Sequence, residues 1–555
     1  MELLDYLVFV TYFLIVASYG YWIYQQKRKT ELDSKAFFLA EGSLTWWAIG
    51  ASLIASNISA EQFIGMSGEG FFVGIAISVY EWIAAVSLII IAVYFMPVYL
   101  KNHIYTMPQF LKRRYNETAA LIMAIFWLFL YVVVNLTSIL YLGSVAINGL
   151  VGGESLHIIL LGLSVFALVI TLGGMKVIGY TDVIQVAVLI IGGLATTYLA
   201  LEIVAESFGA QGAFAGFRVL MEKAPDHFHM IFDKPTAESS QEEISKYLIM
   251  PGILMYVAGQ WIVNLNYWGC NQYITQRALG ADLQTARTGI LFAALLKLLM
   301  PVIVMLPGIA AFVLARNGNL PDLVTKDHAY SAILSFLPAG LKGLSVAALT
   351  AAIVASLAGK ANSISTIFTL DIYKKYINTE ADEHRQVWIG RFTVVAAMVI
   401  AIFFTWSDFL GIGGEGGFTF IQKYTGFISP GVFAMFILGM FWKRTTGTAA
   451  VAGIFTGFIL SVVFNNYAPA WFGNDTLLYT AYPNGQGGYE IPFLLCMGLS
   501  FFFTVAVMVI ISLAGPKDNP NAFEIDRSMF KVNISSRILI FAILMILAAL
   551  YVKFW

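Results

Sequence analysis

Long apolar runs recur along the whole sequence, and they constrain the fold of this chain more than any other feature. A bilayer core is about 30 Å thick and is crossed by a helix of about 20 apolar residues. Scanning for such runs predicts about fourteen membrane-spanning segments. Their approximate ranges are 5–24, 46–70, 74–99, 119–150, 156–173, 181–204, 249–275, 288–315, 341–374, 386–406, 414–441, 446–467, 492–514 and 535–555. Because 59% of the residues are hydrophobic and 12% are charged, against about a quarter charged in soluble domains, we expect an all-α integral membrane protein.

The charges, cysteines and histidines exclude several classes of protein. The net charge is −1 and neither end carries a basic tail, so no nucleic-acid partner is expected. Cys270 and Cys496 lie far apart in apolar stretches, which gives neither a disulfide framework nor a metal-ligand spacing. The six histidines fall at segment ends or in loops, so they form no intramembrane cluster for haem or a transition metal. We therefore expect neither a redox cofactor nor an enzyme.

The first apolar segment is expected to stay in the mature chain. Its leading residues include Glu2 and Asp5, no small-residue cleavage site follows, and Lys27-Arg28-Lys29 comes directly after it. Basic residues concentrate on alternate loops, which the positive-inside rule assigns to the cytoplasm. These loops hold Lys27 to Lys35, Lys101 with Lys112 to Arg114, Arg277 with Arg287, Lys374 with Lys375, and Lys443 with Arg444. This pattern predicts a multi-pass protein of the cell's inner membrane with both termini outside.

The longest loop divides the chain into two sets of segments, which show no clear repeat of residues. This external loop, 205–248, mixes both charge signs with Gly, Pro and Ser, and it separates two sets of five segments, 46–204 and 249–441. Because five is odd, the second set enters the membrane from the opposite side, which is the topology that inverted repeats require. The remaining parts are an extra helix with a cytoplasmic loop, 1–45, and three C-terminal helices, 442–555.

A polar cluster interrupts the middle of the second segment. Residues 52–62 include three serines, an asparagine, a glutamate and a glutamine. Polar side chains in hydrocarbon are costly unless they find partners or water. A broken helix, whose freed backbone groups bind an ion and a substrate near the midplane, accounts for this cluster. The alternative is a polar seam of small residues between two helices.

Two further segments carry polar and aromatic residues that suit a sugar. Glu81 lies within Tyr80-Glu81-Trp82 and has no positive charge nearby in the sequence, so it must pair with a distant charge, accept hydrogen bonds or be protonated. A sugar hydroxyl is a fitting donor to it. Asn264, Tyr267 and Trp268 follow an i, i+3, i+4 spacing, which puts an amide and two aromatic rings on one helical face. Sugars offer C–H faces to aromatic rings and hydroxyls to amides. Ordinary packing of an aromatic face is the alternative.

Several other polar residues fall deep within predicted segments. Lys297 lies inside the apolar run 292–305, where a partner such as Glu81, a ligand hydroxyl or a structural ion pair would account for it. Gln422 follows a glycine-rich stretch, and Asp182 lies near the start of the sixth segment. These three complete the list of polar side chains that lie deep enough in the predicted segments to matter.

Small residues line one face of the ninth segment. Ala352, Ala355 and Ser356 follow a helical spacing within 341–374. Small side chains let backbone carbonyls approach an ion closely, but ordinary packing of membrane helices uses them too.

The sequence resembles the sodium:solute symporter family. The resemblance is carried first by the run from Ala55 to Gly68, which contains the polar cluster. Further similar blocks are Tyr80-Glu81-Trp82, Val134-Asn135-Leu136-Thr137-Ser138, Tyr180 to Val186, Tyr267-Trp268-Gly269, Asn271-Gln272-Tyr273, Lys360-Ala361-Asn362-Ser363, Thr366-Ile367-Phe368 and Tyr424-Thr425-Gly426. The blocks run in order from about residue 37 to the last segment. The resemblance implies a LeuT-type inverted repeat of five plus five helices, with one helix before it and three after.

The resemblance also implies roles for individual residues. By match to the family's sugar site, the residues that hydrogen-bond the sugar or support it would be Gln62, Glu81, Asn264, Lys297, Gln422 and Asn57. The residues that close the site would be Tyr267 as inner gate with Trp268 behind it, and Met66, Tyr80 and Phe418 on the outer side. The sodium ligands would be the backbone carbonyls of Ala55, Ile58 and Ala352 and the hydroxyl of Ser356, with Asp182 on the cytoplasmic exit route of the ion.

Two residues depart from the family's pattern. Ala84 stands where a sugar-binding relative has a serine that contacts the ligand, so one hydrogen bond to the sugar is expected to be absent. Ala355 stands where the relative has the first of two adjacent serines in the sodium site, so Ser356 supplies the only side-chain hydroxyl of that pair. A lower sodium affinity, or a water in place of the missing ligand, would follow.

The resemblance implies sodium-coupled symport of a hexose of the galactose or glucose type by alternating access. The partners would be sodium, a sugar and the lipid bilayer, and a homodimer is one alternative for the assembly. The alternatives are another polyol or sugar such as an inositol, coupling to protons, or a sensor that binds sugar without transporting it. A respiratory subunit of the antiporter type also has about fourteen helices, but it needs a chain of midplane lysines and histidines. Lys297 is the one clearly central lysine by sequence, and no histidine joins it.

Overall fold

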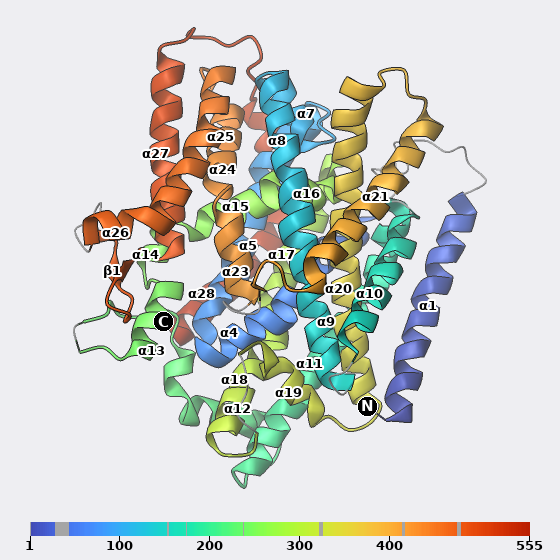
Figure 1. Cartoon of the computed structure of the whole chain (residues 1–555), viewed down its shortest axis with the longest axis vertical. Coiled ribbons are helices and arrows are strands. Elements are labelled where there is room, and N and C mark those ends of the chain that lie inside the picture. Colours follow the sequence, from blue (N-terminus) through green and yellow to red (C-terminus); the bar gives the residue numbers. More distant parts are fainter. Residues whose placement is uncertain are drawn as a thin grey trace. The chain divides into compact units, whose positions relative to one another are not determined.

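The computed structural model describes residues 2–27, 44–151, 155–173, 175–236, 238–320, 326–412, 417–473 and 479–555. These residues fold almost wholly into helices, with one two-stranded sheet (Figure 1). The chain divides into two compact units, each assembled from three stretches of sequence. Unit 1 comprises Met1–Ser78, Ala124–Phe228 and Gln276–Ile421, and unit 2 comprises Val79–Met123, His229–Thr275 and Gln422–Trp555. Each unit is described by itself.

Unit 1 contains most of the first predicted repeat and much of the second. Its helices are α1 (Leu3–Lys27), α3 (Trp46–Asn57), η2 (Glu61–Met66), α4 (Ser67–Phe72), η3 (Ile75–Ser78), η5 (Leu130–Leu136), α9 (Thr137–Val151), α10 (Leu156–Thr171), α11 (Met175–Ser207), α12 (Ala213–Lys223), η6 (Pro225–Phe228), α17 (Leu283–Val304), α18 (Leu306–Arg316), η7 (Lys326–His328), α19 (Ala329–Ser335), α20 (Leu341–Thr366), η8 (Ile367–Ile377) and α21 (Glu383–Trp406). Three helices contain a boundary between the units: α8 (Glu117–Phe129), α16 (Gln272–Leu279) and α23 (Gly417–Gly426).

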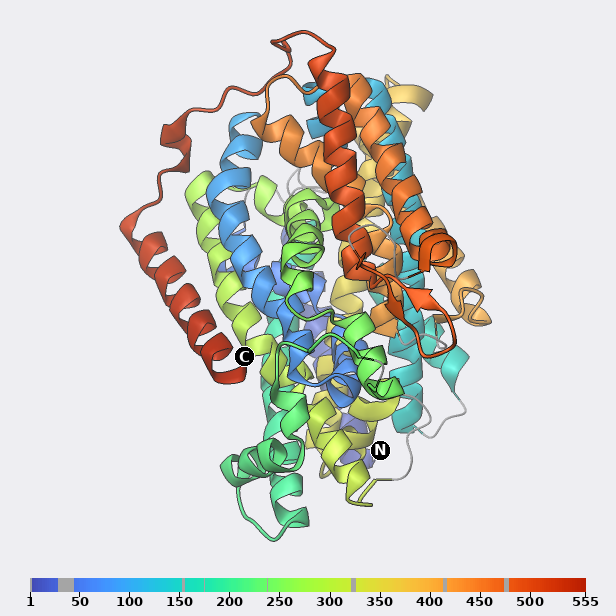
Figure 2. The same ribbon diagram turned by 90° about the vertical axis from the view of Figure 1, so that its left-hand side faces the viewer.

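Unit 2 contains the last helices of the chain. Its elements are α5 (Val79–Ile90), η4 (Ile91–Phe95), α6 (Met96–Lys101), α7 (Met107–Arg114), α13 (Gln241–Ile249), α14 (Leu254–Val257), α15 (Gln260–Cys270), α24 (Ser429–Phe441), α25 (Gly447–Val462), η9 (Val463–Tyr467), α26 (Ala468–Phe472), β1 (Tyr482–Pro483), β2 (Tyr489–Glu490), α27 (Phe493–Leu513), η12 (Arg527–Phe530) and α28 (Ile534–Phe554). The strands β1 and β2 pair antiparallel, with Tyr482 opposite Glu490. In this unit α27 packs beside α25 (Figure 2).

The described helices account for most of the predicted spans. Ten are long and apolar enough to cross a membrane, and two bent pairs raise the number to as many as twelve. Of the other predicted segments, 156–173 forms α10, which has 16 residues, and 46–70 is interrupted. The all-α membrane architecture is therefore confirmed, while the count of fourteen stays a prediction.

Helix α20 forms the centre of unit 1. The span that contains it is 83% buried, against 17% for α1, and it packs on α1, α3, α9, α10, α11 and α21 (Figure 1). Its many alanines, glycines and serines let these neighbours approach closely. At Gly192 of α11, an added Cβ would lie 2.8 Å from the Cβ of Ala348 in α20. The small residues predicted on this segment therefore serve helix packing as well as any ion.

The close approach of α11 to α20 predicts that a larger side chain at Gly192 destabilises the protein. We expect Gly192→Leu to cost about 1–3 kcal/mol because it overpacks a filled interface. The matched control is Gly162→Leu in α10, where an added Cβ meets nothing within 4 Å. Thermal unfolding of the purified protein in detergent measures both. Equal melting temperatures for the two variants would contradict the packing described.

Candidate functional site

The second predicted segment is a broken helix, as its polar cluster indicates. Helix α3 ends at Asn57, and the next residue, Ile58, is extended with φ −79° and ψ 114°. Helical structure resumes in η2, which begins at Glu61. All residues between these two helices are buried. A helix that stops inside the protein exposes backbone groups that need partners, and such breaks form ion and substrate sites in transporters.

The break diverts the hydrogen-bond donors of the two backbone carbonyls predicted to bind sodium. In a continuous helix the Ser59 amide would donate to the Ala55 carbonyl, but it donates to the Oε1 of Gln62 at 3.0 Å. The Gln62 amide would likewise donate to the Ile58 carbonyl, but it donates to the Ser59 carbonyl at 3.1 Å. The carbonyls of Ala55 and Ile58 therefore lose their usual helical donors at the same place.

Helix α20 contributes the other side of this region. Ser356 is fully buried, and its hydroxyl donates to the Ser56 carbonyl at the end of α3 over 3.1 Å. Ala352 lies one turn before Ser356, on the same face of α20 and also buried. The structure thus brings Ser356 to the broken end of α3, where Ala55 and Ile58 lie.

The atoms around this junction suit a small hard cation, which prefers oxygen ligands. The two carbonyls with diverted donors and the Ser356 hydroxyl are oxygen acceptors. The hydroxyl of Ser56 is buried and has no hydrogen-bond partner in the described part of the chain, so it is a further oxygen available to a ligand. The methyl of Ala355 supplies none, as expected from the sequence.

A lysine that the sequence reading left out of the site lies at the same junction. Lys360 is 1% exposed, and its Nζ donates to the Ser356 hydroxyl at 2.9 Å. Its charge also interacts with those of Glu61 and Arg277. The expectation that Lys297 is the one clearly central lysine is therefore wrong. Residue counts along the chain place Lys360 in an apolar helix without showing which way its side chain points.

Asp182 forms a buried polar network with α3 and α16. The Ser52 hydroxyl donates to Asp182 Oδ2 at 2.5 Å, and Arg277 Nε donates to the same hydroxyl at 2.8 Å. Arg277 Nη2 lies 3.7 Å from Asp182 Oδ2. The expected role of Asp182 on the sodium exit route stays a prediction. Its side chain forms an ion pair with Arg277, and the Ser52 hydroxyl bridges the two groups.

Two arginines that the sequence places in a loop lie in helices. Arg277 and Arg287 are counted by sequence among cytoplasmic loop residues, but both are buried, in α16 and α17 respectively. Arg277 is held by the carboxylate of Asp182, a partner that lies about a hundred residues away in the chain. The sequence does not show whether an arginine near the end of a segment faces water or a buried carboxylate.

Five of the predicted sugar-site residues lie in unit 1. Lys297 of α17 is 1% exposed and donates to the Oδ1 of Asn57 at the end of α3. Within this unit Lys297 thus has an amide at the helix break as a partner. Gln62 lies just beyond the break, and its Oε1 also accepts from the Ser59 hydroxyl at 3.3 Å. Gln62 therefore stabilises the break itself.

The other two residues in unit 1 are those expected to close the outer side. Met66, at the end of η2, is fully buried, and Phe418, at the start of α23, is 2% exposed. The neighbour of Met66, Gly65, approaches Phe418 so closely that an added Cβ would lie 2.7 Å from the Phe418 Cβ. The structure therefore brings the segments of Met66 and Phe418 together.

The remaining predicted sugar residues lie in unit 2, where α15 and α5 pack against each other. On α15, the Tyr267 ring meets Trp268 edge-on at 5.2 Å between centroids and Tyr273 at 5.7 Å. The amide nitrogen of Asn264 donates to the Gln260 carbonyl at 2.9 Å, one turn earlier. The two aromatic neighbours thus fix the orientation of Tyr267, a partly exposed ring.

Helix α5 carries Tyr80 and Glu81, both buried, with Ala84 one turn further. Gln422 lies on α23 and is partly exposed. The helix pair is held by the Tyr99 hydroxyl of α6, which donates to the Gly269 carbonyl at 2.7 Å. Unit 2 therefore joins the helices of Tyr80, Glu81, Asn264, Tyr267 and Trp268.

The helix before α15 is also broken, which the sequence did not indicate. The helical stretches Gln241–Val257 and Gln260–Cys270 meet at 77°. The first helix of each predicted set of five is therefore interrupted, at Ile58 in one set and at Ala258 in the other. Paired discontinuous helices in corresponding positions are typical of transporters built from inverted repeats.

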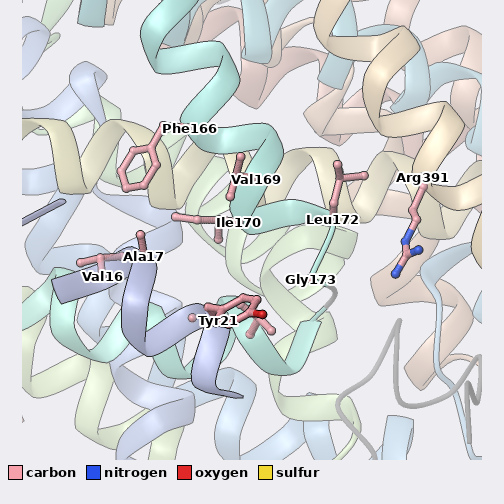
Figure 3. A pocket seen from close by; sticks show the side chains of 11 residues that line it. Val16, Ala17, Tyr21, Phe166, Val169, Ile170, Leu172, Gly173 and Arg391 are labelled. Carbon is pink, nitrogen blue, oxygen red and sulfur yellow. The ribbon is translucent and has the colours of Figure 1, made fainter. Parts of the chain in front are cut away.

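A cavity elsewhere in unit 1 contains none of the predicted residues. It has a volume of about 310 Å³ and lies among α1, α10 and α11, with Arg391 of α21 at one edge (Figure 3). Its walls are largely apolar and include Val16, Phe166 and Ile170. Its side chains with hydrogen-bonding groups are Tyr21 and Arg391, against the six that the predicted sugar contacts would supply.

Comparison with known proteins places the sequence among transporters. Residues 37–457 match the sodium:solute symporter family. The sodium/glucose cotransporter of Vibrio parahaemolyticus is 41% identical over 571 aligned residues, which cover 100% of this chain and 99% of that protein. Sodium/myo-inositol cotransporter 2 of Mus musculus is 33% identical, over 83% of this chain and 70% of that protein.

A solved structure shares the fold. The substrate-bound, outward-open state of a sodium-coupled sialic acid symporter superposes with a TM-score of 0.76 over 93% of this chain and 99% of that chain, at 18% identity. The expected LeuT-type architecture is thereby confirmed.

The network around Asp182 predicts a strong dependence of stability on Arg277. We expect Arg277→Gln to cost about 3–5 kcal/mol, because it leaves a buried carboxylate without its cation. The double variant Asp182→Asn/Arg277→Gln should recover much of that loss. The control is Arg113→Gln, at an exposed arginine. Melting temperatures in detergent measure the cycle, and strictly additive losses in the double variant would refute the pairing.

Proposed function

Because the chain belongs to the sodium:solute symporter family, we propose that it is a secondary active transporter that couples sodium entry to the uptake of a hexose of the galactose or glucose type. In this proposal the protein lies in the inner membrane with both termini outside. The observation that carries the proposal is the break in α3, where the carbonyls of Ala55 and Ile58 lose their helical donors beside Ser356.

The proposed sodium site consists of oxygens from two helices. The carbonyls of Ala55, Ile58 and Ala352 and the hydroxyl of Ser356 would coordinate the ion, which is transported cargo. Binding there would join α3 to α20 by ionic contacts in a region of low dielectric constant, where such contacts are strong. Sodium would thereby favour the conformation in which both helices are in place.

The residues proposed to bind the sugar are those that the resemblance to the family assigns. In unit 1 these are Asn57, Gln62, Met66, Lys297 and Phe418, and in unit 2 they are Tyr80, Glu81, Asn264, Tyr267, Trp268 and Gln422. Amides, a carboxylate and an ammonium can bond the hydroxyls of a sugar, and the ring of Tyr267 can cover its C–H face. The name of the 41% identical relative supports glucose-type substrates.

The break in α3 would couple the two ligands. Ala55 and Ile58 offer carbonyls to the ion, while Asn57 and Gln62 lie on the same stretch and would face the sugar. If sodium orders this stretch, it raises sugar affinity, and by reciprocity the sugar raises sodium affinity by the same factor. Symport follows when the loaded protein changes conformation more readily than a partly loaded one.

A second candidate substrate is an inositol or related polyol. The relatives include a sodium/myo-inositol cotransporter, and Ala84 removes a hydroxyl contact that the resemblance assigns to the sugar. Loss of one hydrogen bond of this kind can change preference among isomers. Counterflow of labelled galactose, glucose and myo-inositol in proteoliposomes separates the candidates.

The sugar assignment predicts that two amides are required for uptake. Gln62→Ala and Gln422→Ala should each reduce uptake at least about tenfold, because a buried polar group left unpaired costs about 1–3 kcal/mol. Gln211→Ala, at an exposed loop position, should leave uptake unchanged. Initial rates of labelled hexose uptake in proteoliposomes test this. Unchanged uptake in both variants would reject this placement of the sugar site.

The sodium assignment predicts a specific defect in Ser356→Ala. Since Ala355 has no hydroxyl, this variant loses the remaining one, so half-maximal uptake should need at least about tenfold more sodium. Sugar binding at saturating sodium should be retained. Ser345→Ala is the control on the same helix, because Ser345 bonds Thr196 at 2.6 Å. Proton-driven uptake in sodium-free buffer that is indifferent to Ser356→Ala would show that another ion is coupled.

A further inference from the structure

The ammonium of Lys360 lies at the hydroxyl proposed to bind sodium. Lys360 follows Ser356 by one turn of α20, and a helical side chain covers the turn before its own Cα. Its Nζ accordingly donates to the Ser356 hydroxyl at 2.9 Å, and that hydroxyl in turn donates a hydrogen bond to the Ser56 carbonyl at 3.1 Å. An unbroken chain of ammonium, hydroxyl and carbonyl thus joins α20 to the end of α3.

The surroundings hold this charge in place. Lys360 is 1% exposed, and a charged group inside a membrane protein is costly unless it is paired or hydrogen-bonded. The charges that act on it include the buried carboxylate of Glu61 in η2 and the guanidinium of Arg277 in α16. Arg277 is itself paired with Asp182 of α11 and packs against Gly359, the neighbour of Lys360.

We propose that Lys360 is a tethered cation that occupies the Ser356 oxygen when sodium is absent and competes with sodium for it. The ammonium and the sodium ion are both monovalent cations that oxygen lone pairs satisfy. The Ser356 hydroxyl donates its hydrogen bond to the Ser56 carbonyl. The lone pairs of the hydroxyl oxygen therefore remain for a cation. Two cations within a few ångströms repel each other, so sodium can bind only when the Lys360 side chain leaves this oxygen.

The departure at Ala355 favours the competition, because α20 then offers one hydroxyl at this place and the other hydroxyl nearby, that of Ser56, comes from α3. With a second hydroxyl beside Ser356, the lysine and the ion could each take one oxygen, but Ala355 offers a methyl. The negative charge of Glu61 attracts the Lys360 ammonium, so a side chain displaced from Ser356 would move toward that carboxylate. The consequence is a transporter whose sodium site responds only to high sodium, because each ion must displace a resident charge. This inference rests on the proposed sodium coupling.

Sodium binding to purified full-length protein tests the proposal without transport. Sodium chloride is titrated against N-methylglucamine chloride at constant ionic strength, and the melting temperature is followed. Lys360→Met removes the charge and the hydrogen bond, and Lys360→Gln removes the charge but keeps a donor. We expect both variants to reach the half-maximal shift of the melting temperature at a sodium concentration at least about tenfold lower than the natural chain needs. This difference corresponds to about 1.4 kcal/mol of sodium-binding free energy. Lys374→Met, at an exposed lysine further along the same span, should not change the midpoint.

A double variant separates two explanations for tighter sodium binding, namely removal of the competing lysine and loss of the charge that balances Glu61. Lys360→Met removes a positive charge that acts on the Glu61 carboxylate, and the unbalanced carboxylate alone could attract sodium. Glu61→Gln/Lys360→Met removes both charges and should still bind sodium more tightly than the natural chain. A midpoint equal to that of the natural chain, or weaker, would overturn the tethered-cation proposal while leaving sodium symport intact. If sodium bound to the variants but not to the natural chain, the result would support the tethered-cation proposal and overturn sodium coupling. If sodium bound to none of the proteins, both proposals would be overturned.

Discussion

The requirement that backbone groups inside a membrane protein find partners governs this structure. Helix α3 stops at Asn57 in the interior of unit 1, where unsatisfied carbonyls and amides would be costly. The Gln62 side chain and the Ser59 carbonyl accept from the amides beyond the break. What remains is a pair of carbonyls, at Ala55 and Ile58, whose helical donors are engaged elsewhere. The proposed ion site depends on this pair.

Buried charges converge on the same helix and are each matched by a partner. Ser52 links Asp182 to Arg277 on one side of α3, and Asn57 accepts from Lys297 at its end. Ser56 accepts from Ser356, which in turn accepts from Lys360. Pairing of this kind is what permits ionisable groups in an apolar interior. A change of ligand at the break would therefore alter several charge pairs at once, which is the physical basis expected for coupling.

Much of this architecture could be predicted from the sequence. The apolar runs gave the all-α membrane fold, and the polar cluster at residues 52–62 correctly predicted the break, because few arrangements tolerate so many polar side chains in a bilayer. The interruption near Ala258 was missed, since its flanking residues are apolar or glycine. Arg277 and Lys360 were also missed as site residues. Their roles depend on Asp182 and Ser356, and a helical side chain's direction and its distant partners cannot be read from spacing alone.

The central claim is that a sodium gradient drives sugar into the compartment. The most direct measurement is uptake of labelled galactose and glucose by the purified protein in liposomes, with an inward sodium gradient and with a sodium-free buffer of equal ionic strength. The account predicts accumulation above the external sugar concentration only with the sodium gradient, and its collapse when a sodium ionophore is added. Equal uptake without sodium, or accumulation that follows a proton gradient alone, would contradict it.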